Sequence, residues 1–96
     1  MASDDIILDT AELLVDAVAL SQALLDGDVP EGRFRARLIA AKASAMGFDE
    51  VRAAADQVID LLGLPGDRPR PGHAVAVTAL SEKIESAAEF MRNTSP

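Results

Sequence analysis

His73 is the only histidine among the 96 residues, which makes it the first candidate for proton-transfer chemistry. An imidazole titrates near neutral pH and therefore suits a general base or a phosphate acceptor. No partner for such a role lies at helical spacing from His73, and the start of a helix disfavours an imidazolium. We therefore predict that His73 caps the edge of an apolar helix face, and that the chain is not an enzyme.

Other kinds of reactive or ligand-binding site also find little support. The absence of cysteine excludes a disulfide framework, a thiolate zinc site and a cysteine nucleophile. The serines and threonines form no nucleophile elbow. The glycine-rich segment 63–72 lacks both the lysine and the strand-to-helix context of a phosphate-binding loop. We predict no catalytic residue, no metal site and no cofactor.

The most informative group of charges lies in the segment 31–46. This segment holds four basic residues against one acidic residue, a net charge of +3, whereas the whole chain carries −7. Two interpretations are open: a solvated face that pairs with neighbouring acids, or a docking surface for an acidic partner, where arginine can bind carboxylates in a bidentate manner. The candidate partner-binding residues are Arg33, Arg35, Arg37, Lys42 and Ser44.

Apolar residues recur at helical spacing along the chain, and no segment has the alternation typical of a strand. The predicted fold class is therefore all-α, and the short links favour an antiparallel four-helix bundle. We expect a single domain that spans residues 1–96. The predicted helices cover residues 5–26, 31–46, 49–62 and 72–92, with a connection rich in proline and glycine at 63–72.

Each helix is expected to turn one apolar stripe towards the core, with Asp9, Glu12 and Asp16 on the opposite face of the first helix. The stripe of the first helix is Ile7, Ala11, Leu14, Val18 and Leu25, widened by Leu13, Ala17, Leu20 and Leu24. The second stripe is Phe34, Leu38, Ala41 and Ala45, and the third is Val51, Ala55, Val58 and Leu62. The fourth is His73, Val77, Leu80, Ile84, Ala87 and Met91.

The spacing of residues around the second helix resembles the central motif of histidine-containing phosphotransfer (HPt) domains. Gly27-Asp28 precedes the helix, and Ala36-Arg37 stands where the family has an Ala-His pair. Ala43 also fits, and Gly47 follows Arg37 by ten places, as the family's helix-ending glycine follows the histidine. The resemblance spans about two-thirds of the chain, and it implies a four-helix bundle.

Arg37 therefore stands at the position of the phospho-accepting histidine, and Ala40 replaces the lysine that follows it in the family. A guanidinium has no available lone pair at neutral pH, so it cannot accept a phosphoryl group. The resemblance implies a non-catalytic regulator of two-component signalling that carries no phosphate. Such a protein would dock an acidic surface of a receiver domain or a sensor kinase.

Two other classes of function stay open. A small acidic neutralising protein, such as an antitoxin, an immunity protein or an inhibitor, would bind a basic partner. It would use the acidic side chains Asp9, Glu12, Asp16, Glu82, Glu85 and Glu89. A self-associating bundle, for example a homodimer, would instead use apolar residues that the bundle leaves exposed, such as Ile6, Ile39 and Met46.

The net charge of −7 argues against a protein that coats nucleic acid or an anionic membrane, since both need a dominant basic surface. The first apolar run follows two aspartates, unlike a signal peptide, which opens with positive charge. No window reaches the roughly 18 apolar residues of a membrane span. We therefore expect a cytoplasmic protein.

Overall fold

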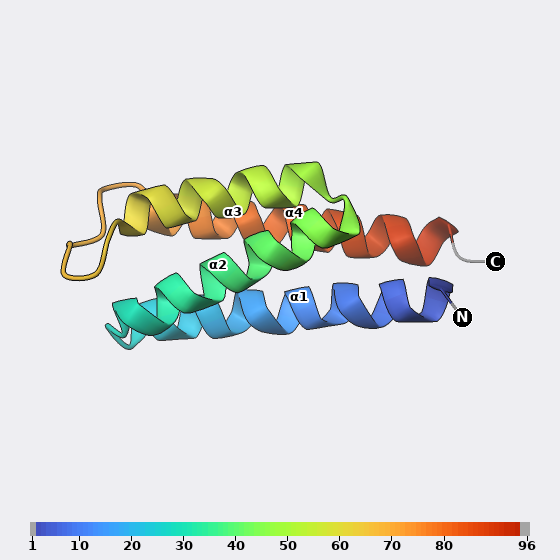
Figure 1. Ribbon diagram of the computed structural model, residues 1–96, viewed down its shortest axis with the longest axis horizontal. Coiled ribbons are helices and arrows are strands. Elements are labelled where there is room, and N and C mark those ends of the chain that lie inside the picture. Colours follow the sequence, from blue (N-terminus) through green and yellow to red (C-terminus); the bar gives the residue numbers. More distant parts are fainter. Residues whose placement is uncertain (1, 95–96) are drawn as a thin grey trace.

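The computed structural model describes residues 2–94, and the side chains of residues 8–93. The described residues form four helices and no strand, so the predicted all-helical fold is confirmed. Successive helices run in opposite directions along the long axis of the molecule, and the start of α1 lies at the same end as the end of α4 (Figure 1). The helices are α1 (Ala2–Leu25), α2 (Val29–Met46), α3 (Asp49–Leu62) and α4 (His73–Thr94).

Each helix packs against two others, because α1 and α3 both contact α2 and α4. The core lies between the four helices and is made mainly of leucine, isoleucine and valine. Ala36, Ala43 and Ala55 are also fully buried, and their small side chains let α2 and α3 approach closely. The largest fully buried side chains are Leu13, Leu20, Ile39, Val51, Val58, Leu62, Leu80 and Ile84.

Local signals determine where α2 begins and ends. The Asp28 carboxylate caps the helix by accepting a hydrogen bond of 3.2 Å from the Glu31 N–H. Pro30 occupies the first turn, so the helix begins at Val29, two residues before its expected start. Gly47 ends it with φ of 75°, a left-handed conformation that glycine adopts readily, and this agrees with the expected stop.

The expected buried face agrees with the structure in α3 and agrees in part in α4, where the expected His73 is half-buried. Val51, Ala55, Val58 and Leu62 are all buried in α3. In α4 the buried side chains are Val77, Leu80, Ile84 and Ala88, whereas Ala87 and Met91 are half-buried. The core therefore covers the main apolar stripe of each helix, while Val75 and Phe90 of α4 stay exposed.

The buried face of α1 differs from the prediction. Ala11, Val18 and Leu25 are exposed, although they were expected in the core, and Asp16 is only 4% exposed, although it was expected in water. This helix is apolar on two opposite sides, so periodicity alone does not select between them. The side that faces the core is the one with Thr10, Leu13, Asp16, Ala17, Leu20 and Ala23.

The buried face of α2 also differs from the prediction. Phe34 is 55% exposed, Ala41 and Ala45 are exposed, and Leu38 is half-buried. The physical reason is close packing: a Cβ atom at Gly32 would lie 2.8 Å from Leu24 Cδ2 of α1. Small residues on this side let the helices approach, whereas a phenylalanine would hold them apart. The buried residues of α2 are Gly32, Arg33, Ala36, Ile39 and Ala43.

Among the described residues, no helix is both long enough and apolar enough to cross a lipid bilayer.

Candidate interaction site

Arg33 does not lie on an exposed basic surface, because it is only 7% exposed and points towards the end of α3. Its Nε donates to the Gly63 carbonyl at 3.1 Å, and its Nη2 donates to Leu62 at 3.2 Å and to Asp67 at 2.9 Å. The cation thus satisfies carbonyl groups at the C-terminus of a helix, where the dipole favours positive charge. Arg33 is corrected from a partner-binding candidate to a residue that holds the α3–α4 connection.

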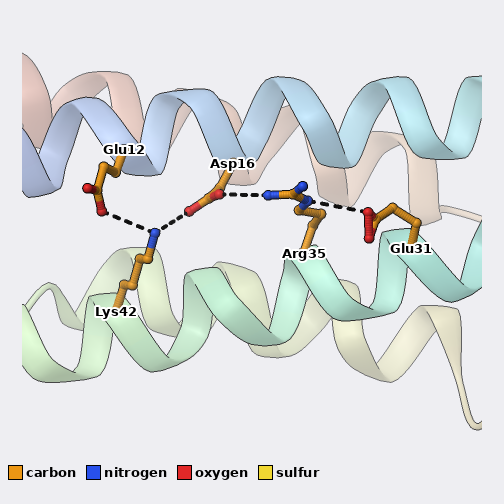
Figure 2. Close-up of polar contacts among 5 residues, drawn as sticks. All are labelled: Glu12, Asp16, Glu31, Arg35 and Lys42. Carbon is orange, nitrogen blue, oxygen red and sulfur yellow. Dashed lines mark hydrogen bonds and ion pairs between the residues drawn. The ribbon is translucent and has the colours of Figure 1, made fainter.

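Arg35 and Lys42 project from α2 towards α1, where both contact Asp16 (Figure 2). Lys42 Nζ donates to Asp16 Oδ2 at 2.8 Å and to Glu12 Oε2 at 3.3 Å. Arg35 Nη1 donates to Asp16 Oδ1 at 3.3 Å, and its Nε lies 3.6 Å from Glu31 Oε2. These four ion pairs fit the interpretation that basic residues of α2 balance neighbouring acids.

Asp16 is the centre of this network, since each of its carboxylate oxygens accepts from a different cation. A buried carboxylate requires such partners, because burial of an unpaired charge is very costly. The two cations are about 30% exposed, so they keep part of their contact with water while they neutralise the acid. The face of α1 that holds Asp16 can therefore lie against α2.

The network predicts a specific alkaline loss of stability. The hydrogen bond to Asp16 raises the pKa of Lys42 above its usual value of 10.5, and the contact with Glu12 acts in the same direction. A raised pKa means that this stabilisation is complete below pH 10.5 and disappears as pH rises through the folded-state pKa. Urea unfolding between about pH 9 and 12 should therefore show Lys42→Met converging on the wild type, from a deficit of about 1 kcal/mol.

Lys83 provides the matched control for this measurement, because it is the other lysine of the chain and lies exposed on α4. Lys83→Met removes the same charge without removing a contact to Asp16, so it serves as the reference for the pH-dependent difference of Lys42→Met. A deficit of Lys42→Met that stays constant above pH 11 would contradict the assigned role of the Asp16 contact.

Arg37 and Ser44 are the candidate residues that lie on the exposed surface of α2. Among the described residues, no acidic side chain lies within ion-pair distance of Arg37. Its guanidinium is thus available to a partner, unlike those of Arg33 and Arg35. Of the four basic residues in this segment, Arg37 alone combines exposure with freedom from an ion pair within the described part of the chain.

The exposed side of α2 is apolar, and we call Phe34, Leu38, Ala41 and Ala45 the outer face of α2. These residues repeat at helical spacing and were expected in the core, but Phe34, Ala41 and Ala45 are exposed and Leu38 is half-buried. The Arg35 guanidinium lies 5.6 Å from the centre of the Phe34 ring, a cation–π contact that helps to hold the ring in place. Arg37 belongs to the same helix and is exposed beside this face.

His73 stands at the first position of α4 and is half-buried. Its Nδ1 lies 3.0 Å from the Arg70 carbonyl, a contact within the α3–α4 connection. Within the residues described, no group of three or more histidine, cysteine or acidic side chains is arranged to hold a metal ion. The histidine is far along the chain from α2, and the structure gives it a local contact at a helix start.

Some of the residues proposed for the two alternative functions already make contacts within the protein. Glu12 and Asp16 pair with Lys42, whereas Glu82, Glu85 and Glu89 are exposed on α4. Two apolar residues proposed for self-association are not exposed: Ile39 is fully buried, and Met46 packs against the core. The Ile6 side chain lies outside the described residues.

In comparisons with known proteins, no family model, no curated protein and no solved structure matches the chain. The resemblance to HPt domains therefore rests on the residues of α2 and their spacing, and it stays a prediction.

Proposed function

We propose that this chain is a non-catalytic interaction module of two-component signalling, with an antiparallel, HPt-like helical bundle. It docks a receiver domain or a sensor kinase through the outer face of α2 and carries no phosphate itself. The observation that carries the proposal is the free, exposed guanidinium of Arg37, at the position that the HPt resemblance gives to the phospho-accepting histidine.

The outer face of α2, together with Arg37 beside it, has the composition of a protein-docking surface. Phe34 supplies a large aromatic group, Leu38 and Ala41 extend the apolar area, and Arg37 supplies the charge. Protein interfaces are enriched in aromatic residues and arginine at their centres, where a few side chains contribute most of the binding energy. The free cation favours a partner that presents a carboxylate, because arginine and carboxylate form two parallel hydrogen bonds.

Fewer basic residues of α2 are available to bind a partner than the sequence suggested. Arg33 is committed to the α3–α4 connection, and Arg35 and Lys42 are largely neutralised by acids of α1 and α2. Arg37 therefore carries the electrostatic part of the recognition, with Ser44 two turns further along the helix. Docking that depends on one main ion pair should weaken moderately as salt rises.

The test is a binding titration against purified receiver domains encoded in the same genome. Arg37→Glu should weaken binding of the receiver that the wild type binds by roughly 10- to 100-fold, because it replaces an attraction with a repulsion. Phe34→Ala should weaken the same complex by about 10-fold through loss of apolar contact. Both variants should keep the wild-type helical content, since both side chains are exposed.

Arg68→Glu is the matched control, because Arg68 is exposed in the α3–α4 connection and the substitution changes net charge equally. It should leave the affinity within about twofold of the wild type. Equal losses of affinity for Arg37→Glu and Arg68→Glu would show that the effect comes from the net charge and not from the position of Arg37. No binding by the wild type to any receiver or sensor kinase of that genome would overturn the proposal.

A further inference from the structure

The outward side of α1 carries a second exposed apolar surface, which we call the outer row of α1. Its residues follow one another alternately three and four positions apart, and none of them is charged. Leu8, Val15, Val18 and Leu25 are 63%, 66%, 70% and 81% exposed. All six residues of the row are exposed, although α1 contacts both α2 and α4. The row consists of Leu8, Ala11, Val15, Val18, Gln22 and Leu25.

The spacing of the row is the heptad spacing by which one helix packs along another. The core of this chain does not use it, because α1 packs inward through the opposite side, with Leu13 and Leu20 fully buried. The row is about 26 Å long at ~1.5 Å per residue, or nearly five turns of helix. A surface of this shape fits a second helix along its whole length.

We propose that the outer row of α1 is the contact of a homodimer, in which α1 packs antiparallel against α1 of a second copy. The row matches its own reverse: each Leu8 would face a Leu25, and each Val15 would face a Val18 of the other copy. Ala11 would face Gln22, so that the smallest side chain meets the longest one. A parallel arrangement would instead place alanine on alanine and glutamine on glutamine, which leaves a gap and an amide pair in the contact.

The charge of the chain favours a second copy of the chain, and not a membrane, as the partner of the outer row of α1. Helix α1 contains no lysine or arginine, and the whole chain carries −7, so an anionic lipid surface would repel it. A groove of about 250 Å³ borders the row between α1 and α4, lined among others by Val18, Gln22 and Leu25. It offers space for side chains from the second helix, as knobs-into-holes packing requires.

The strength of the dimer follows from its size. A single helix face of this length lies below the roughly 800 Å² per partner of a standard interface. We therefore expect a weak, reversible dimer that forms in the micromolar concentration range. Since both copies are acidic, added salt should strengthen the dimer, which is the opposite of the salt effect expected for docking through Arg37.

Sedimentation equilibrium of the whole chain, from about 5 to 500 µM, tests the proposal. The wild type should pass from monomer to dimer, and Val18→Asp should raise the dissociation constant at least 10-fold, because it places a charge in the apolar contact. Val75→Asp is the matched control, since Val75 is 74% exposed and belongs to α4, not to the row. It should dimerise as the wild type does. A wild type that stays monomeric throughout, or equal effects of the two variants, would overturn the proposal.

Disulfide trapping tests the antiparallel direction, and the absence of native cysteine makes the result simple to interpret. Under mild oxidation, a mixture of Leu8→Cys and Leu25→Cys chains should form the mixed disulfide, whereas neither variant alone should cross-link efficiently. In an antiparallel pair, the two copies of position 8 lie about 26 Å apart, too far for a disulfide. Efficient self-cross-linking of Leu8→Cys would overturn the antiparallel geometry.

The dimer and the proposed docking function use different helices, so their failures can be told apart. Val18→Asp should leave receiver binding through α2 within about twofold, and Arg37→Glu should leave the dimer intact.

Discussion

Replacing Arg33 with leucine should lower the free energy of unfolding by about 3 kcal/mol, although leucine is apolar and the site is buried. The guanidinium donates to three backbone carbonyls, those of Leu62, Gly63 and Asp67. Leucine would leave these acceptors without their donors, and the bond to Leu62 is buried while the other two are part-buried. Loss of three charge-assisted hydrogen bonds from one buried side chain is among the few single changes that cost this much.

Arg37→Leu is the matched control, because the same substitution one turn further along α2 removes an exposed arginine. Urea denaturation should show a change of less than about 0.5 kcal/mol for this control. Thermal melting should show Arg33→Leu lowered by roughly 10–20 °C. Equal effects of the two substitutions would contradict the assignment of Arg33 to the α3–α4 connection.

A second measurement separates local from general loss of stability in Arg33→Leu. The Arg70 N–H donates to the Leu61 carbonyl at 2.8 Å, within the connection that Arg33 holds. Its hydrogen exchange should accelerate more than that of amides in the middle of α4, because the connection loses its anchor to α2. Arg33→Lys should give an intermediate result, since an ammonium group lacks the planar geometry that reaches several carbonyls at once.

Alanine substitution should lower the free energy of unfolding more at Ile39 than at Phe34. The sequence pattern, which places Phe34 in the core, suggests the opposite order. Ile39 is fully buried, so Ile39→Ala should cost about 3 kcal/mol through lost burial and the cavity that remains. Phe34 is 55% exposed, so Phe34→Ala should cost less than about 1 kcal/mol, including its contact with Arg35.

Chemical denaturation of the two variants, with the wild type beside them, tests the rotation of α2 about its axis. The ratio of the two losses is the informative quantity, because both substitutions shorten a large apolar side chain in the same helix. A larger loss of stability for Phe34→Ala than for Ile39→Ala would contradict the observed packing of α2. It would instead support the buried face that periodicity predicts.

The reliability of the sequence prediction differed between the two halves of the chain for a physical reason. In α3 the larger apolar residues Val51, Val58 and Leu62 form one buried stripe, so periodicity identifies the buried face. In α4 the longest regular run of apolar residues, Val77, Leu80 and Ile84, is likewise the buried one, although Val75 and Phe90 are exposed. Helix α1 has apolar residues on two opposite sides. Helix α2 has mainly small residues, with Phe34 and Leu38 on one side and Ile39 on another. A period alone does not decide which of two apolar sides the core covers.

Local sequence pattern also did not predict the contacts of the candidate site. The sequence correctly showed that basic residues gather in one helix, but it did not show their separate environments. Asp16 binds Lys42 from a position 26 residues earlier, and Arg33 binds the Leu62 carbonyl from 29 residues earlier. Arg37 lies on the same helix and has neither kind of contact within the described residues. Contacts at such separations depend on how the helices are placed together.

By itself, the sequence determined the helical class, the positions of the helices to within three residues, and the excess of acid. The physical reason is that caps and stops act locally: Asp28 and Pro30 start α2, and Gly47 and Gly63 end helices. The tertiary structure alone decided the rotation of α1 and α2, and with it which arginine is free and which apolar rows are exposed. That choice depends on close packing at Gly32 and on the pairing of a buried acid with distant bases, which no local pattern records.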